Sequence, residues 1–157
     1  MARSQFAGLA ALILIAACGW LQGQIRTSLN GVWKMDPAKS DFGGGPVSDS
    51  RLDRIGIEGS TLKDTITQKL HGAPESTYDM IYTLDGKECT NHVRGNLVES
   101  TAQWEGEALF VDSKVHTLRM AILKDRYTVS PDGKTLTLLR HMSGARNAEQ
   151  KIVFDRQ

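Results

Sequence analysis

From Ile25 onward the chain is divided into short runs of residues, and no window repeats apolar residues with the period of an α-helix. Within the runs apolar and polar residues alternate, or β-branched residues accumulate. Turn residues separate the runs about every eight to twelve positions, as in Gly59-Ser60, Asp85-Gly86 and Pro131-Asp132-Gly133. Glycine in such turns takes the positive φ that a tight hairpin needs. The pattern predicts an all-β protein.

The runs define ten expected strands. They are Val32–Met35, Arg51–Glu58, Thr61–Leu70, Ser76–Leu84, Glu88–Val93, Leu97–Trp104, Ala108–Val115, Leu118–Val129, Thr135–His141 and Glu149–Asp155. The run Leu118–Val129 is long enough that we expect it to contain a β-bulge. Asp36–Ser50 is the one long irregular segment, and we expect it to be a connecting loop.

Alternation assigns one face of each strand to a shared core. In Ser76–Leu84 the side chains of Tyr78, Met80 and Tyr82 share a face, opposite Asp79. Connections this short join antiparallel neighbours, because a parallel crossover needs about a dozen residues or more. Such a meander must curl into a barrel or split into a sandwich to bury its apolar face. Because the hairpins follow one another without long returns, we expect a single antiparallel up-and-down barrel of eight to ten strands over residues 25–157.

Residues 1–24 have the features of a leader for export, with a signal helix. Arg3 supplies the positive charge, and Phe6–Ala17 is an apolar stretch too short to span a bilayer stably. Leu14–Gly19 resembles the lipobox of bacterial lipoproteins, which implies lipid attachment at Cys18 and a membrane anchor. The alternative is ordinary cleavage nearby, with Cys18 discarded. Either way we expect the domain in the periplasm, on the outer envelope or outside the cell.

Charge and motif content argue against several function classes. The chain has 19 Lys and Arg against 18 Asp and Glu, interspersed, so it lacks the one-signed field that nucleic acid selects. The four histidines are 21, 24 and 25 residues apart, so no pair has the spacing of metal ligands on one strand. We therefore expect no metal and no cofactor. No G-x-S-x-G motif is present, and the one cysteine of the expected domain, Cys89, has ordinary neighbours, so catalysis is not expected.

Several stretches resemble small secreted bacterial proteins with lipocalin-like domains. They are residues 29–34 with 36–42, Trp104-Glu105-Gly106, and residues 130–138. In the wider calycin superfamily a G-x-W element on the first strand packs its tryptophan across the closed end of the barrel, against a basic residue from a late strand. Gly31-x-Trp33 matches this element, and the resemblance implies Arg140 as the partner of Trp33. Such a contact contributes on the order of 0.5 to 2 kcal/mol.

One expected strand carries polar residues on its apolar face. Asp64 and Gln68 alternate with apolar residues along Thr61–Leu70, so they point into the lumen if that face is interior. Tyr78 and Tyr82 on the next strand, with Trp104, complete a candidate ligand pocket. The alternative is that this strand lies at the rim, with Asp64 and Gln68 in water.

The expected barrel favours one function and leaves two others open. An eight-stranded barrel is about the size that holds one small ligand, so the first interpretation is an exported binding module for a small apolar or amphipathic molecule. The second is a ligand-free structural or interaction protein of the cell envelope. The third is an enzyme that uses the barrel mouth. The sequence leaves the oligomeric state undetermined.

Overall fold

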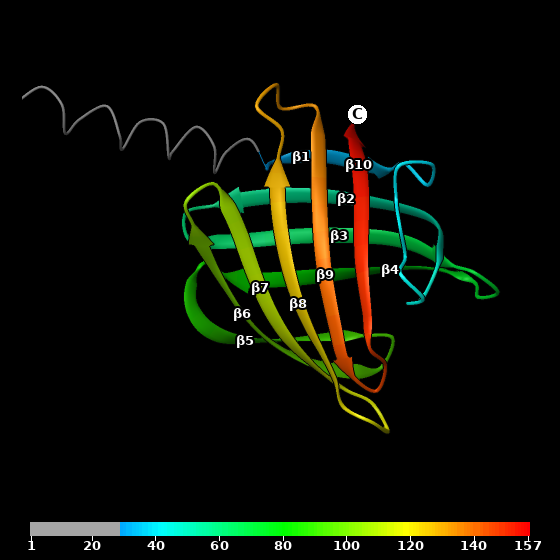
Figure 1. Ribbon diagram of the computed structural model, residues 1–157. Coiled ribbons are helices and arrows are strands. Elements are labelled where there is room, and N and C mark those ends of the chain that lie inside the picture. Colours follow the sequence, from blue (N-terminus) through cyan, green and yellow to red (C-terminus); the bar gives the residue numbers. More distant parts are fainter. Residues whose placement is uncertain (1–28) are drawn as a thin grey trace, which may run out of the picture.

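The computed structural model describes residues 29–157, which form ten antiparallel β-strands and no helix that could cross a membrane (Figure 1). The strands are β1 (Gly31–Met35), β2 (Ser48–Glu58), β3 (Thr61–Leu70), β4 (Glu75–Thr83), β5 (Asp85–Val93), β6 (Asn96–Glu105), β7 (Ala108–His116), β8 (Ala121–Val129), β9 (Thr135–Gly144) and β10 (Ala148–Arg156). The predicted all-β barrel is confirmed. The expected signal helix, leader and lipid attachment at Cys18 lie outside the described residues.

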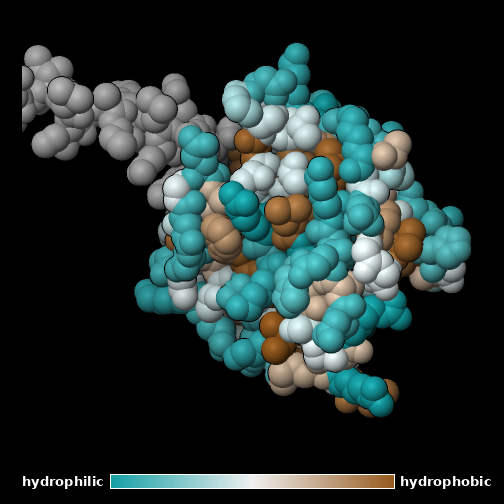
Figure 2. All heavy atoms as spheres, in the orientation of Figure 1, coloured by the Kyte–Doolittle hydropathy of each residue, from teal (hydrophilic) through white to brown (hydrophobic). Residues whose placement is uncertain are grey.

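The strands form one sheet in the order β4-β3-β2-β1-β10-β9-β8-β7-β6-β5. Because β1 pairs with β10, the first and last strands are neighbours, and the meander curls on itself. Figure 1 shows β1 to β4 crossing β7 to β10 at a steep angle, so that two halves of the sheet face each other. The face of the molecule shown in Figure 2 is mostly hydrophilic, as the alternation predicts. Side chains buried completely or nearly so fill the space between the halves: Trp33, Leu109, Leu136, Leu138 and Phe154.

The connection between β4 and β5 differs from the prediction. These strands are adjacent but share no backbone ladder, so Asp85-Gly86 is not the turn of a paired hairpin. The register of β5 against β6 shifts between Asp85 and Glu88, which places a bulge where the turn was expected. The Asn91 side chain spans the seam: its Oδ1 accepts from the Ile81 amide (2.8 Å) and its Nδ2 donates to the Ile81 carbonyl (2.9 Å). The Asn91 side-chain amide therefore makes the two hydrogen bonds that a backbone residue of a paired strand would make.

The expected strand Leu118–Val129 is wrong in its first three residues. Val115 of β7 pairs with Ala121 of β8, so residues 117–120 form the loop of this hairpin. The Leu118 side chain is fully exposed there. We placed the start of the strand at Leu118 because this residue is apolar, but its side chain is not buried against the described chain.

Trp33 closes one end of the barrel, as the G-x-W element implies. Its side chain is fully buried, and its Nε1 donates to the Leu29 carbonyl at 2.8 Å. The Arg156 guanidinium lies 4.2 Å from the centre of the indole. Arg156 also donates from Nη1 to the Asn30 carbonyl (2.7 Å) and from Nε to the Gly133 carbonyl (2.6 Å). One guanidinium thus contacts the residue before β1, the β8–β9 turn and the indole of Trp33.

The predicted pairing of Trp33 with Arg140 is wrong. Trp33 of β1 lies directly opposite Arg156 of β10, and residues opposite each other on antiparallel strands share a face. Arg140 lies on β9, one strand further away, and its guanidinium binds Asp125 instead. The resemblance supplied the right kind of contact, but the choice of arginine depended on which strand closes the barrel.

The structure shows why the first position of the G-x-W element is a glycine, Gly31. Its φ is +146°, and a Cβ at this position would lie 2.6 Å from Arg156 Nη1. The absence of a side chain lets the guanidinium approach the backbone and reach the indole.

We expect Gly31→Ala to lower the free energy of unfolding by about 1–3 kcal/mol, because the added methyl group displaces Arg156 from Trp33. Urea unfolding followed by tryptophan fluorescence measures this change. Gly56→Ala in β2 is the matched control, since a Cβ there meets no atom within 4 Å. Equal stability of the two variants would contradict the assigned role of Gly31.

Candidate functional site

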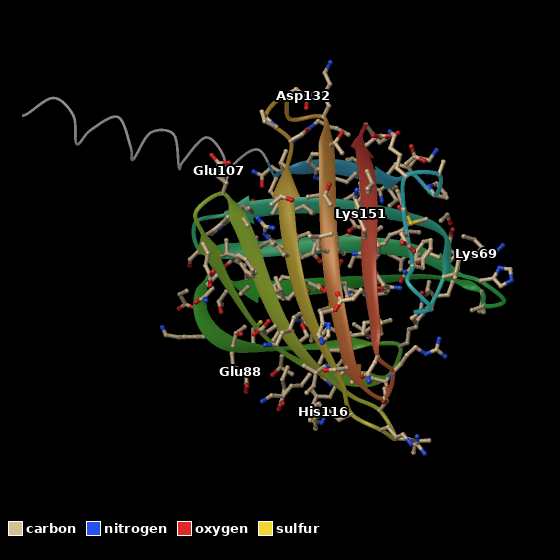
Figure 3. All side chains as sticks on the ribbon, viewed as in Figure 1. Lys69, Glu88, Glu107, His116, Asp132 and Lys151 are labelled. Atoms are coloured by element: carbon tan, nitrogen blue, oxygen red, sulfur yellow. The ribbon has the colours of Figure 1, made fainter. Side chains whose placement is uncertain are left out.

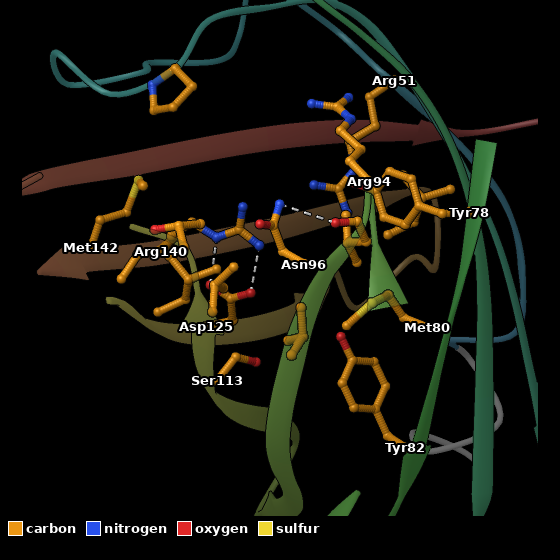
Figure 4. A pocket seen from close by; sticks show the side chains of 18 of the residues that line it. Arg51, Tyr78, Met80, Tyr82, Arg94, Asn96, Ser113, Asp125, Arg140 and Met142 are labelled. Carbon is orange, nitrogen blue, oxygen red and sulfur yellow. Dashed lines mark hydrogen bonds and ion pairs between the residues drawn. The ribbon is translucent and has the colours of Figure 1, made fainter. Parts of the chain in front are cut away.

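A cavity of about 370 Å³ occupies the part of the lumen away from Trp33. Figure 4 shows side chains from several strands converging on it. Its apolar lining comprises Ile66, Met80, Val93, Val98, Val115, Leu123 and Met142, and its polar lining includes Arg51, Tyr78, Tyr82, Ser113, Asp125, Tyr127 and Arg140. Pro46, Arg94 and Thr117, which precede β2 or follow β5 and β7, also line it, so the cavity extends to the loops at this end.

An ion pair lies in one wall of the cavity. Asp125 of β8 is directly opposite Arg140 of β9, and the guanidinium donates from Nε and Nη2 to the two carboxylate oxygens, each at 2.7 Å. Burial lowers the pKa of Arg140, but the charge and hydrogen bonds of Asp125 outweigh it, so the pKa is raised overall. The arginine is therefore held as a cation by a carboxylate with matching geometry.

A second ion pair comes from a single strand. Arg51 and Asp53 are two residues apart on β2 and share the inward face. Their guanidinium and carboxylate form two hydrogen bonds of 2.8 Å, and both side chains are almost completely buried. The Arg51 guanidinium also lies 5.4 Å from the Phe154 ring centre. The two lumen arginines are thus each matched by one carboxylate, and their charges cancel.

Asp64 lies deeper in the lumen and differs from the other two aspartates. It is 3% exposed, and its Oδ1 has no hydrogen-bond partner among residues 29–157. It lines a separate void of about 10 Å³ together with Leu29, Tyr82 and Tyr127. Burial, and then the negative charge of Asp53, raise the pKa of Asp64 well above its usual value, which favours the protonated acid. The void is close to the smallest space that holds a water molecule.

Three tyrosines line the cavity, and hydrogen bonds hold one of them, Tyr78, in place. The Tyr78 hydroxyl donates to Gln68 Oε1 at 3.1 Å, and Gln68 Nε2 donates to Ser48 Oγ at 2.6 Å. Burial raises the pKa of Tyr82 and of Tyr127, so both remain neutral hydroxyls. Neither of these two hydroxyls has a hydrogen-bond partner within the described part of the chain, and both residues line the cavity.

The predicted pocket residues have different roles in this arrangement. Tyr78 and Tyr82 line the cavity, Gln68 holds Tyr78, and Asp64 lies in the adjoining void. The half-buried Trp104 packs against the core and is not part of the cavity lining. The alternative that Asp64 and Gln68 lie in water at the rim is wrong, because they are 3% and 9% exposed.

Sequence reasoning missed the lumen residues Arg51, Ser113, Asp125 and Tyr127, and it assigned Arg140 to Trp33 instead of to the lumen. Alternation would have placed Arg51 with Asp53, and Asp125 with Tyr127, on the inward faces of their strands. That Asp125 meets Arg140 depends on the register of β8 against β9. Among residues 29–157 no three His, Cys, Asp or Glu side chains come together as a metal site requires.

Comparison with known proteins supports the fold. The sequence matches no family model and no curated protein. A secretary abundant heat soluble protein from Ramazzottius varieornatus is similar in structure, with 15% identity, a TM-score of 0.58, and coverage of 83% of this chain and 96% of that one. Fatty-acid-binding protein 1 of Echinococcus granulosus has 12% identity, a TM-score of 0.58 and coverage of 82% and 97%.

Zebrafish ileal bile acid-binding protein, solved with cholic acid, has 18% identity, a TM-score of 0.51 and coverage of 83% and 98%. Likeness at such low identity shows the fold alone. It confirms the predicted lipocalin-like barrel fold.

Asp64 makes stability depend on pH. Its carboxyl titrates near pH 4 in the unfolded chain and at a higher pH in the fold. Between these values the folded chain binds the extra proton, so the contribution of Asp64 to the free energy of unfolding falls as pH rises. Asp64→Asn has no proton to lose. We expect its stability relative to the unsubstituted chain to grow from about pH 4 upward, by at most about 1.4 kcal/mol per pH unit.

Urea unfolding of both proteins across this pH range measures the difference. A stability difference that stays constant with pH would show that Asp64 is not held protonated by the fold.

Proposed function

We propose that this barrel binds one small amphipathic molecule in its lumen. The observation that carries the proposal is the cavity of about 370 Å³, which lies inside the barrel and has both an apolar and a polar lining. Its volume falls within the range of about 300–1,000 Å³ that is usual for ligand sites. Two of the solved structures named above support the proposal, since one is a fatty-acid-binding protein and the other is a bile acid-binding protein solved with cholic acid, and both have the same fold as this chain.

The apolar body of the ligand would lie against one part of the wall. Met80, Val98, Val115 and Leu123 come from four different strands, and all line the cavity. Removing an apolar chain from water against such side chains is favourable by roughly 25 cal/mol per Å² of buried area. This term supplies affinity without requiring a particular ligand shape.

The polar group of the ligand would meet hydrogen-bond donors that line the same cavity. Arg140 uses Nε and Nη2 for Asp125, whereas its Nη1 makes no hydrogen bond to residues 29–157. The hydroxyls of Tyr82 and Tyr127 line the same cavity. Together they can donate hydrogen bonds to an acceptor oxygen.

The balance of charge in the lumen specifies the kind of polar group. Arg51 and Arg140 are neutralised by Asp53 and Asp125, and the environment of Asp64 favours its uncharged form. Beside these pairs a carboxylate would be a buried charge without a matching cation, because Arg94, the other arginine of the lining, is exposed at the opening. Burying such a charge is costly. The ligand class that fits best therefore has an uncharged polar group, such as a hydroxyl or carbonyl, on an apolar body.

The first test fills the cavity. We expect Met80→Trp to weaken binding of the neutral fluorescent probe N-phenyl-1-naphthylamine by about tenfold or more, because the indole occupies ligand space. Ile81→Trp is the matched control, since Ile81 is the next residue on β4 and is 46% exposed. Leu123→Trp at a half-buried position of the lining repeats the test if Met80→Trp does not fold. Unchanged affinity in a folded lumen variant would contradict the proposed site.

Displacement of the same probe tests the polar group. Dodecan-1-ol should displace it at a lower concentration than dodecanoate, measured at a pH where the acid is ionised. Stronger displacement by dodecanoate would overturn the preference for an uncharged group and would leave the lumen site itself standing.

We also propose that the chain is exported through the leader expected at residues 1–24, which lie outside the described residues. The charge of Arg3, the apolar run Phe6–Ala17 and the lipobox-like residues around Cys18 support this proposal. We expect the intact mass of the protein from its native host to correspond to a chain that begins at lipidated Cys18 or shortly after it without lipid. A native chain that retains Met1 would contradict export by cleavage.

A further inference from the structure

The loops around the cavity opening and the adjoining start of β8 carry four of the six exposed large apolar side chains of residues 29–157. Leu118 is fully exposed, Met120 is 47% exposed and Val47 is 45% exposed. Ile122, at the start of β8 beside this loop, is 37% exposed. The only other exposed large apolar residues in the described chain are Ile81 and Leu139, which lie within strands. An apolar cluster at one end of a barrel differs from the scattered exposure that is normal for a surface.

Hydrogen bonds join these loops into one surface. The Ala145 amide donates to the Met120 carbonyl at 3.0 Å, and Arg146 donates to the Gly44 carbonyl at 3.1 Å. Figure 1 shows the loops after β7 and β9 at the same end of the barrel. Pro46, Arg94 and Thr117 connect the surface to the cavity, since all three line it. We name Val47, Arg94, Leu118, Arg119, Met120 and Arg146 the rim patch.

The loop residues nearest the opening are basic. Residues 42–47, 71–74, 94–95, 117–120 and 145–147, which surround the opening, contain three arginines and no Asp or Glu. Arg94, Arg119 and Arg146 are exposed, and none forms an ion pair within the described part of the chain.

The segments next to these loops include four acidic side chains. Asp49 at the start of β2 and Glu149 at the start of β10 are hydrogen-bonded to His71 and His141, whereas Asp41 and Glu75 are exposed. The opposite end of the barrel has Glu107 and Asp132 in its turns, and Figure 3 shows both far from His116 beside the rim. The formal net charge of the whole chain is only +1, so the basic rim is a local property.

We propose that the rim patch docks onto a lipid bilayer that contains anionic phospholipid. The guanidinium groups match phosphate in charge and geometry. Leu118, which protrudes from a loop tip and contacts little of its own chain, can insert among acyl chains, as exposed apolar groups do at a membrane interface. A bilayer offers both chemistries at one surface. Docking in this orientation turns the cavity opening toward the lipid.

The bilayer proposal stands apart from ligand binding. It rests on the exposed residues of the loops, whereas the proposed function rests on the lumen. Ligand-free protein is therefore the right sample for the test, and the two proposals can fail separately.

The experiment is flotation of purified, ligand-free protein with phosphatidylcholine vesicles that either contain or lack phosphatidylglycerol. We expect association with the anionic vesicles, and weaker association as salt is raised. Arg119→Glu should weaken it by at least about fivefold, the effect of one basic residue near an anionic surface. Lys134→Glu makes the same charge change in a turn at the opposite end and should have little effect.

A second pair of variants tests the apolar contribution. Leu118→Ser should reduce vesicle binding, whereas Leu139→Ser, at a residue 40% exposed on the outer face of β9, should leave it unchanged. Circular dichroism and thermal unfolding establish that each variant is folded. Equal binding to both vesicle types, binding to neither, or equal binding by the rim variants and their controls would overturn the proposal.

Discussion

The pairing of β1 with β10 is the contact on which the rest of the barrel depends. It brings together two segments more than a hundred residues apart, and Arg156 seals them by stacking on Trp33 and binding two backbone carbonyls. Loop closure over such a distance costs entropy, which the contacts made at the closed end must offset. The closed end then gives the lumen a floor, so that the unfilled space lies toward the other end. The cavity is a consequence of where the barrel is sealed.

The lumen combines an apolar wall with charges that cancel in pairs. A buried ion pair adds little to stability compared with apolar residues of the same size, but breaking one leaves an unpaired charge and is costly. The pair Arg140–Asp125 links β8 to β9, whereas the pair Arg51–Asp53 lies within β2. Each pair leaves hydrogen-bond donors in the lumen while its own charges cancel.

The two ends of the barrel have different surfaces because they are made by different connections. At the closed end the connections are tight turns, and the chain packs against Trp33. At the open end the loops are basic and partly apolar, and backbone hydrogen bonds such as that from Ala145 to Met120 join them. The lumen and the rim patch meet there at Arg94 and Thr117.

Alternation along the sequence was sufficient to predict ten strands, their antiparallel order and the inward direction of Tyr78 and Tyr82, because the period of two is a local property of each strand. It predicted the kind of contact at Trp33 but not its partner, since Arg140 and Arg156 have equivalent local patterns and only the strand order separates them. Tertiary structure likewise decided three other features. They are the edge between β4 and β5 without backbone pairing, the loop at Leu118, and the ion pair between Asp125 and Arg140. These features depend on register and on closure between distant segments, and no local pattern encodes which strand becomes the neighbour of another.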